Sequence, residues 1–170
     1  MNQVLRRWNQ ASRAEAVGEI VACCGAAAWS AMLAERRPFP DEASLLAASD
    51  EAWLSLAPSD WLEAFRSHPR IGETSAKASM PAQSASWSRQ EQDGVSTSTE
   101  PVKATLADAN RAYEQKFGHI FIVCAAGKSA VEILAILRRR MQNDEDTELR
   151  DAAEQQRQIT QLRLKKWLGI

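Results

Sequence analysis

Two histidines occur in the 170-residue chain, and His68 lies in RSHPRIGE at residues 66–73. An imidazole has an unperturbed pKa of about 6.5, so it can donate or accept a proton near neutral pH. Pro69 restricts the backbone beside His68, and an irregular stretch follows. Position alone still favours a surface or helix-capping role for His68. The other histidine, His119, follows Gly118 at a predicted helix end, where contacts with the last carbonyl groups are the favoured interpretation.

A second polar group lies in SRQEQ at residues 88–92. Ser88 and Glu91 share one face of a helix, and Gln92 lies one turn beyond Ser88. The same S-x-x-E spacing is also typical of an N-terminal capping box, which has no catalytic content. Arg163, in QLRLKKWL, is the third candidate, although most arginines at a basic helix end are simply solvated.

The cysteines predict no metal site. Cys23, Cys24 and Cys124 form neither a CxxC pair nor a cluster with histidines. Cys23 and Cys24 are interpreted as small helical core residues without a redox role. The GKS sequence at 127–129 is not a phosphate-binding loop, because Ile122 stands where that motif needs a glycine. The free N–H groups of the helix that follows can still bind an oxyanion.

The elements that must position these residues are predicted to be helices. Apolar residues recur at helical spacing, which predicts an all-α, single-domain bundle of about seven to eight helices. The capping box at Ser12 predicts the first helix, and Asp41 and Asp144 predict the starts of later ones. Residues 71–87 show no period and predict a long loop after residue 70. The isolated apolar run IFIVCAA predicts a buried, short extended segment near 120–125.

Length and composition limit the class of protein. We expect one domain covering residues 1–170, because single cores commonly reach roughly 100 to 200 residues. Lys and Arg total 21 against 22 Asp and Glu, so no general attraction to nucleic acid is expected. No segment approaches the length of a membrane span and the N-terminus lacks a signal-peptide core, so we expect no membrane partner and a cytoplasmic location.

Together, the motifs resemble one known family. SDWLEAFRSHPRIGE, SRQEQ, KFGHIFIVCAAGKSAVEIL and ELRDAAEQQRQITQLRL follow one another in order, with RPF at 37–39 upstream. This series is similar to the 2-oxo-4-hydroxy-4-carboxy-5-ureidoimidazoline (OHCU) decarboxylases of urate catabolism and covers nearly the whole chain. The departures are modest: Asp93-Gly94-Val95 stands where relatives often have Ala-Gly-Leu, and the loop between His68 and Glu91 is slightly long.

The resemblance implies an all-α, cofactor-free homodimer that converts OHCU to (S)-allantoin. It implies His68 as the catalytic acid, with Glu91 and Arg163 as its partners. The implied substrate contacts, besides Glu91, are Pro69, Ser88, Arg89, Gln90, Gln92, Phe121, Ile122, Val123, Cys124 and Ala125. Arg70 and Glu73, the remaining charges of RSHPRIGE, are interpreted as solvated loop residues.

The implied chemistry fits these residue types. Decarboxylation needs an electron acceptor, and OHCU carries its own ring C=N, so no cofactor is required. Glu91 can accept the proton of the ring hydroxyl while His68 protonates the ureido-bearing carbon, and the Arg163 fork suits a carboxylate or a ring or ureido oxygen. Backbone groups at 121–125 can recognise a ureide edge.

Two other interpretations stay open. One is a cofactor-free enzyme of the same scaffold with a related ureide or imidazoline substrate, which a substrate panel would distinguish. The other is a helical interaction module in which tryptophan-rich faces bind a partner helix. Six tryptophans at helical spacing are more often core residues, and thermal stabilisation by a substrate analogue would separate the module from an enzyme.

Overall fold

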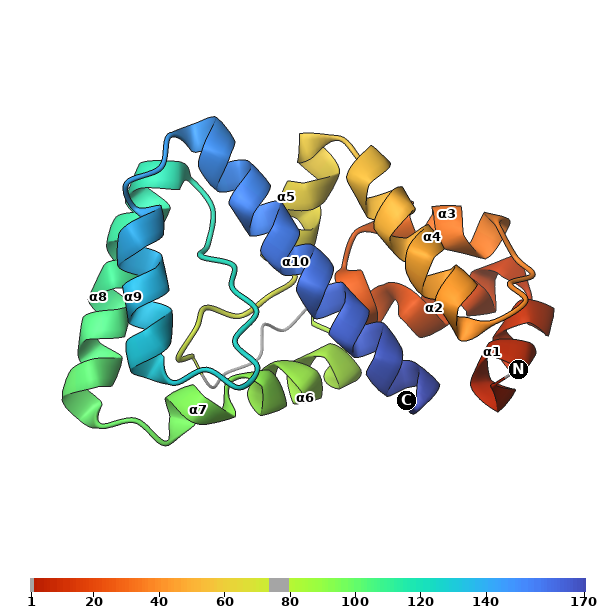
Figure 1. Cartoon of the computed structure of the whole chain (residues 1–170), viewed down its shortest axis with the longest axis horizontal. Helices are drawn as coiled ribbons and strands as arrows, with labels where there is room; N and C mark the ends of the chain where they lie inside the picture. The colour runs from red at the N-terminus through yellow and green to blue at the C-terminus, as the bar shows by residue number, and fades with distance from the viewer. Residues whose placement is uncertain (1, 74–79) are drawn as a thin grey trace. The chain divides into compact units, whose positions relative to one another are not determined.

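A computed structural model describes residues 2–73 and 80–170, and over these residues the chain is all-α, with ten helices and no strand. This confirms the predicted fold class, with a somewhat higher helix count than expected. The helices are α1 Gln3–Gln10, α2 Arg13–Cys24, α3 Ala27–Glu35, α4 Glu42–Ser55, α5 Pro58–Arg66, α6 Ala82–Glu91, α7 Asp93–Ser96, α8 Glu100–Phe117, α9 Ala130–Arg140 and α10 Glu145–Leu168 (Figure 1). Each of these helices in the described residues is too short or too polar to span a bilayer.

Several helix ends follow from local sequence. Ser12 forms the predicted capping box with Glu15 at the start of α2. The Asp41 side chain accepts from the backbone N–H of Ser44 at α4, and Asp144 accepts from Thr147 at α10. Gly118 ends α8 with a φ of 75°, a left-handed conformation that glycine adopts without strain.

Two helical predictions were wrong. Helix α1 precedes the predicted first helix, and Asn2 caps it by accepting from the N–H of Val4 at 2.8 Å. Helix α6 begins at Ala82, so the predicted loop 71–87 extends too far. The described part of that loop is residues 71–73 and 80–81, and the rest of it lies outside the described residues. The buried residues of α6 include serines and an alanine, which give no apolar period.

The described chain divides into two compact units. Unit 1 comprises Met1–Ala64 with Arg157–Ile170, and unit 2 comprises Phe65–Gln156. Helices α5 and α10 each continue from one unit into the other. A single domain covering 1–170 therefore stays a prediction.

Tryptophans form much of the interior of unit 1. Trp8, Trp29 and Trp53 are fully buried. The indole N–H of Trp8 donates to Ala16 O at 2.9 Å, and that of Trp29 donates to Ser49 O at 3.3 Å. These rings thus remove apolar surface from water while their one polar group stays bonded. Trp87 is also buried and Trp61 and Trp167 are half-buried, so four of the six tryptophans are core residues, which disfavours the interaction-module interpretation.

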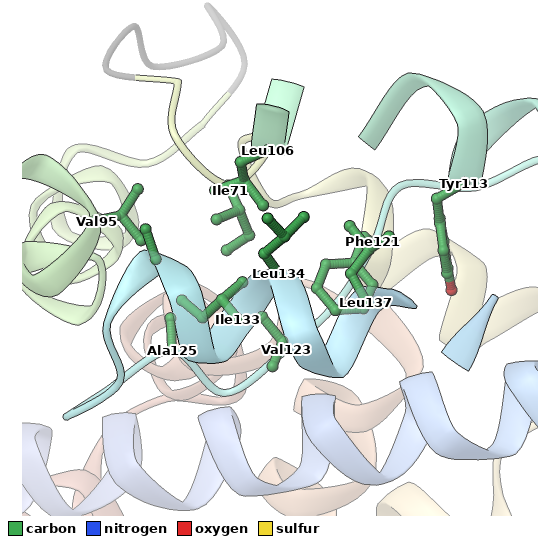
Figure 2. Packing of buried hydrophobic residues seen from close by; sticks show 11 residues of the cluster. Ile71, Val95, Leu106, Tyr113, Phe121, Val123, Ala125, Ile133, Leu134 and Leu137 are labelled. Carbon is green, nitrogen blue, oxygen red and sulfur yellow. The ribbon is translucent and has the colours of Figure 1, made fainter. Parts of the chain in front are cut away.

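The core of unit 2 lies between α8, α9 and a non-helical segment. Helices α8 and α9 pack against each other (Figure 1). The segment 121–125, which runs between them in the sequence, is buried, as predicted. Figure 2 shows its Phe121, Val123 and Ala125 side chains packed with Ile133 and Leu137 of α9. Alternate side chains therefore enter one cluster, which is the period of an extended chain.

Candidate active site

A cavity of about 520 Å³ lies in unit 2, lined by the chain after His68 and by residues of α6, α7 and α8. Four of its lining residues were predicted as substrate contacts: Pro69, Ser88, Arg89 and Gln92. Its size falls within the range of roughly 300 to 1,000 Å³ that is typical of small-molecule sites. The structure thus brings two predicted site segments, far apart in sequence, to one cavity.

Helix α6 turns a polar face inward. Ser84, Ser88 and Glu91 recur at spacings of four and three residues, and all three are buried. Ser88 lies inside α6, so the capping-box interpretation of S-x-x-E is wrong here. Arg89 and Gln90 are exposed; Arg89 still lines the cavity, whereas Gln90 is outside its described lining.

Two side chains hold the chain that follows His68. Gln92 Oε1 accepts from the backbone N–H of Gly72 at 2.9 Å. Asn110 Nδ2, in α8, donates to Ile71 O at 3.0 Å and is buried. Gly72 has a φ of 89°, where a side chain would be strained. This wall of the cavity is therefore fixed by hydrogen bonds to its backbone and by one glycine conformation.

His68 is buried, with 6% of its surface exposed. Its Nε2 lies 2.6 Å from Oε1 of Gln156 in α10. An amide oxygen only accepts, so Nε2 donates in this contact. The backbone N–H of His68 donates to Phe65 O at 3.1 Å. Ring and backbone are thus both held, so the surface-role interpretation of His68 is wrong.

Polar side chains also hold the backbone of the extended segment 121–125. Gln155 Oε1 accepts from the Cys124 N–H at 2.9 Å, and Lys128 Nζ donates to Cys124 O at 2.9 Å. The guanidinium of Arg140 donates to Ile122 O at 2.6 Å. Gln155 directly precedes the Gln156 that contacts His68, so consecutive residues of α10 support two predicted parts of the site.

A close approach joins α7 to the turn after this segment. A Cβ added to Gly94 would lie 2.3 Å from the backbone oxygen of Lys128, so only glycine fits there. Gly94 follows α6 by three residues, and Lys128 follows the extended segment by three. The α6–α7 region and the segment 121–125 are therefore neighbours at this point.

Arg163 lies in unit 1, and its side chain is buried with 1% of the residue exposed. Its Nη1 donates to Ala22 O at 3.2 Å. This burial excludes the interpretation of a solvated helix-end arginine. Burial raises the pKa of the Cys23 thiol to about 12 although the Arg163 charge opposes the shift, and burial likewise raises the pKa of Cys24 to about 12. Both cysteines are core residues, as predicted.

Two predictions for charged or titratable loop residues were wrong. Arg70 is not simply solvated, because its Nε and Nη2 donate to the two carboxylate oxygens of Glu114 at 2.5 and 3.0 Å. This pair raises the pKa of Arg70 above its usual range. His119 does not cap the carbonyls of α8; its Nδ1 contacts Ile120 O, and its ring packs against Phe65 at 5.3 Å between centroids.

Gln155, Gln156 and Arg140 were missed by the sequence analysis. The two glutamines are uncharged and belong to a polar helix, so their types and spacing carry no signal. Arg140 was interpreted only as part of a basic helix end. The described residues contain no group of three or more His, Cys, Asp or Glu side chains that could hold a metal ion.

Comparisons with known proteins point in one direction. Residues 9–165 match the family model described as OHCU decarboxylase. The chain is 34% identical over 148 residues to the uric acid degradation bifunctional protein TTL of Arabidopsis thaliana, covering 85% of this chain but 44% of that protein. It is 30% identical over 154 residues to the 2-oxo-4-hydroxy-4-carboxy-5-ureidoimidazoline decarboxylase of Amia calva, covering 88% of this chain and 84% of that protein.

A solved structure agrees in fold. A crystal structure of OHCU decarboxylase in the presence of (S)-allantoin superposes with a TM-score of 0.76 and 30% sequence identity, covering 89% of this chain and 98% of that one. The family model covers most of the chain, and the all-α fold agrees with that match. The chain therefore belongs to the OHCU decarboxylase family of carboxy-lyases.

Proposed function

We propose that this chain decarboxylates OHCU to (S)-allantoin in urate degradation. The observation that carries the proposal is the cavity of unit 2, which brings Pro69 together with Ser88 and Gln92 in a chain that belongs to the family. The chain spans less than half of the Arabidopsis bifunctional protein, so the proposal takes only the decarboxylation from that relative.

The reaction needs no external electron sink. When the bond to the carboxylate breaks, CO₂ leaves and the electron pair moves toward the ring C=N of the substrate. The ring nitrogen takes up one proton, and the enol-like intermediate gains another at the ureido-bearing carbon while its hydroxyl loses one to form the carbonyl of allantoin, so the reaction takes up one proton for each CO₂ released. The protein has to orient the substrate, stabilise moving charge and deliver one proton to one face.

His68 is the proton donor in this proposal. Its buried ring is held by Gln156, so its direction is set before substrate binds. A single fixed donor delivers the proton to one face and explains one enantiomer of the product. Glu91, buried at the end of α6, accepts the hydroxyl proton.

The remaining predicted residues recognise the substrate. Arg163 binds a carboxylate or a ring or ureido oxygen through its planar fork, a role that rests on the family resemblance and on its burial. Residues Ser88–Gln92 contact the substrate, and backbone groups of Phe121–Ala125 contact its ureide edge. We also propose that the chain works as one domain and as a homodimer, which size-exclusion chromatography with light scattering tests.

The direct test replaces His68 with Asn and follows freshly generated OHCU by absorbance and the product by circular dichroism. Turnover should fall by roughly 10² to 10⁴-fold, the usual contribution of positioned proton transfer. His119→Phe is the matched control, because that ring packs among aromatic side chains and should be dispensable. Wild-type formation of (S)-allantoin by His68→Asn would remove His68 from the reaction.

The same assay tests the proposed roles of Glu91 and Arg163 separately. Glu91→Gln keeps size and hydrogen bonding but cannot accept the proton, so kcat should fall. Arg163→Lys keeps the charge without the fork, so substrate binding or turnover should weaken. If the wild-type chain leaves OHCU unchanged but processes another ureide at equal enzyme concentration, the family scaffold has a different substrate here.

A further inference from the structure

We propose that Arg140, fixed by Glu148, is a positioning residue that sets the register of segment 121–125 for reading the substrate. The inference rests on the proposed decarboxylase function, because that function assigns the segment to substrate recognition. Arg140 lies in α9 and Glu148 in α10, and neither was a predicted site residue.

The ion pair between the two residues is buried. Arg140 is 3% exposed and Glu148 is fully buried. Arg140 Nε donates to both carboxylate oxygens at 2.9 and 3.2 Å, and Nη2 donates to Oε1 at 2.5 Å. Asn143 Nδ2 and the Tyr113 hydroxyl donate to the same carboxylate. Such a fork-to-carboxylate contact fixes the plane and direction of the guanidinium.

The third nitrogen of that guanidinium reaches the extended segment. With Nε and Nη2 occupied by Glu148, Nη1 donates to Ile122 O at 2.6 Å. The guanidinium carbon also lies 4.6 Å from the centroid of the Phe121 ring, a cation–π distance. Arg140 therefore contacts the backbone of one segment residue and the side chain of its neighbour.

A buried charge pair calls for a reason beyond stability, because well-packed apolar residues often stabilise as much. The segment 121–125 is neither helix nor strand, so side chains supply several of the hydrogen bonds that its buried backbone groups need. Arg140 supplies a hydrogen-bond donor with a fixed direction, because Glu148 binds Nε and Nη2 of the same guanidinium. The ion pair thus holds the Ile122 carbonyl in one defined position.

The position of the Ile122 carbonyl matters because the backbone groups of an extended segment alternate between its two edges. The anchors act on even-numbered residues, at Ile122 O and at the N–H and C=O of Cys124. Backbone groups of neighbouring residues in an extended chain point to opposite edges, so Val123 directs its N–H and C=O away from these anchors. A slip of the segment by one residue would exchange the two edges. Arg140 therefore decides which edge a ureide can meet.

The test uses Arg140→Lys, which keeps a positive charge for Glu148 but lacks the fork that reaches Ile122 O. We expect KM for OHCU and the dissociation constant for (S)-allantoin to rise roughly tenfold, as loss of about one substrate hydrogen bond would cause. Turnover at saturating substrate should change much less, because the proton donor is untouched. Amide hydrogen exchange of Val123 and Cys124 should become faster.

Two further variants separate positioning from general damage. The double variant Arg140→Met/Glu148→Leu removes both charges together, so it leaves no unpaired ion while still removing the donor to Ile122 O. It should reproduce the rise in KM. Tyr113→Phe removes the hydroxyl that donates to the same carboxylate but keeps the ring that packs against Phe121, so it should keep a wild-type KM and wild-type exchange at Val123.

The outcomes are distinct. Wild-type KM, allantoin affinity and segment exchange in a folded Arg140→Lys protein would overturn the inference, as would an equal change in Tyr113→Phe. If the wild-type chain turns over no OHCU, the proposed function fails by itself. The exchange at Val123 then still decides whether Arg140 sets the segment.

Discussion

The two units stabilise their interiors in different ways. In unit 1 large indole rings fill the core, and those of Trp8 and Trp29 each donate one hydrogen bond to a helix carbonyl. In unit 2 the irregular stretches are held by polar side chains on their backbone, such as Asn110 on Ile71 O. The described cavity with four predicted contacts belongs to unit 2. Irregular backbone can present its polar groups to a ligand, but it needs buried polar residues to keep its shape.

Among tests of this comparison, substitutions of the consecutive residues Gln155 and Gln156 of α10 are expected to have the largest effects on activity. Gln156→Leu removes the acceptor for the His68 ring, so kcat should fall by roughly 10- to 100-fold through misplacement of the proton donor. Gln155→Leu removes the acceptor for the Cys124 N–H, so KM should rise more than kcat falls. Steady-state kinetics on OHCU measures both. Identical kinetic changes in the two variants would mean that the side chains act only through general stability.

Glycine substitutions test close packing in the two units with one chemical change. Gly94→Ala forces its Cβ against the Lys128 backbone oxygen, so the free energy of unfolding should fall by about 1 to 3 kcal/mol. Gly18→Ala, at an exposed position inside α2 with no atom within 4 Å of the added Cβ, should raise it by up to about 1 kcal/mol. Urea denaturation gives both values. A neutral Gly94→Ala would show that α7 and the turn at Lys128 move apart freely.

The cysteines of unit 1 predict a pH dependence of stability that is confined to alkaline pH. Burial raises the pKa of Cys23 and Cys24 from near 9 to about 12, so folding favours the protonated thiols. Their stabilising contribution is complete below pH 9 and is lost as pH rises toward 12, by at most about 1.4 kcal/mol per pH unit for each thiol.

Chemical denaturation at several pH values measures this loss. The Cys23→Ala/Cys24→Ala variant serves as the control, because it retains every other titrating group. Its stability should decline less steeply across the same pH window. Equal slopes for the two proteins would contradict a role of the buried thiols.

Helix ends were largely predictable because their signals are local. Ser12, Asp41 and Gly118 act through their own backbone neighbours, and the structure confirms each of them. Helix α6 was partly missed because small polar residues such as Ser84 form its buried face. Burial of serine depends on what packs against it, which no local pattern records.

The cavity contacts were predictable only through the family resemblance. Spacing alone left His68 and Ser88 as capping or surface residues, although both are buried in the structure. The supporting residues Gln155, Gln156 and Arg140 act on partners between 18 and 88 positions away. Long-range hydrogen bonds of this kind leave no periodic trace in the sequence.

The adjacency of Gln155 and Gln156 has a mechanical consequence. A helix is stiff over a single peptide unit, and consecutive side chains leave it about 100° apart. The imidazole of His68 and the amide of Cys124 are therefore both bonded to the same turn of α10, so thermal displacement of α10 moves both together. The separation between the acid and the extended segment should then fluctuate less than the distance of either from α6, which has a separate support.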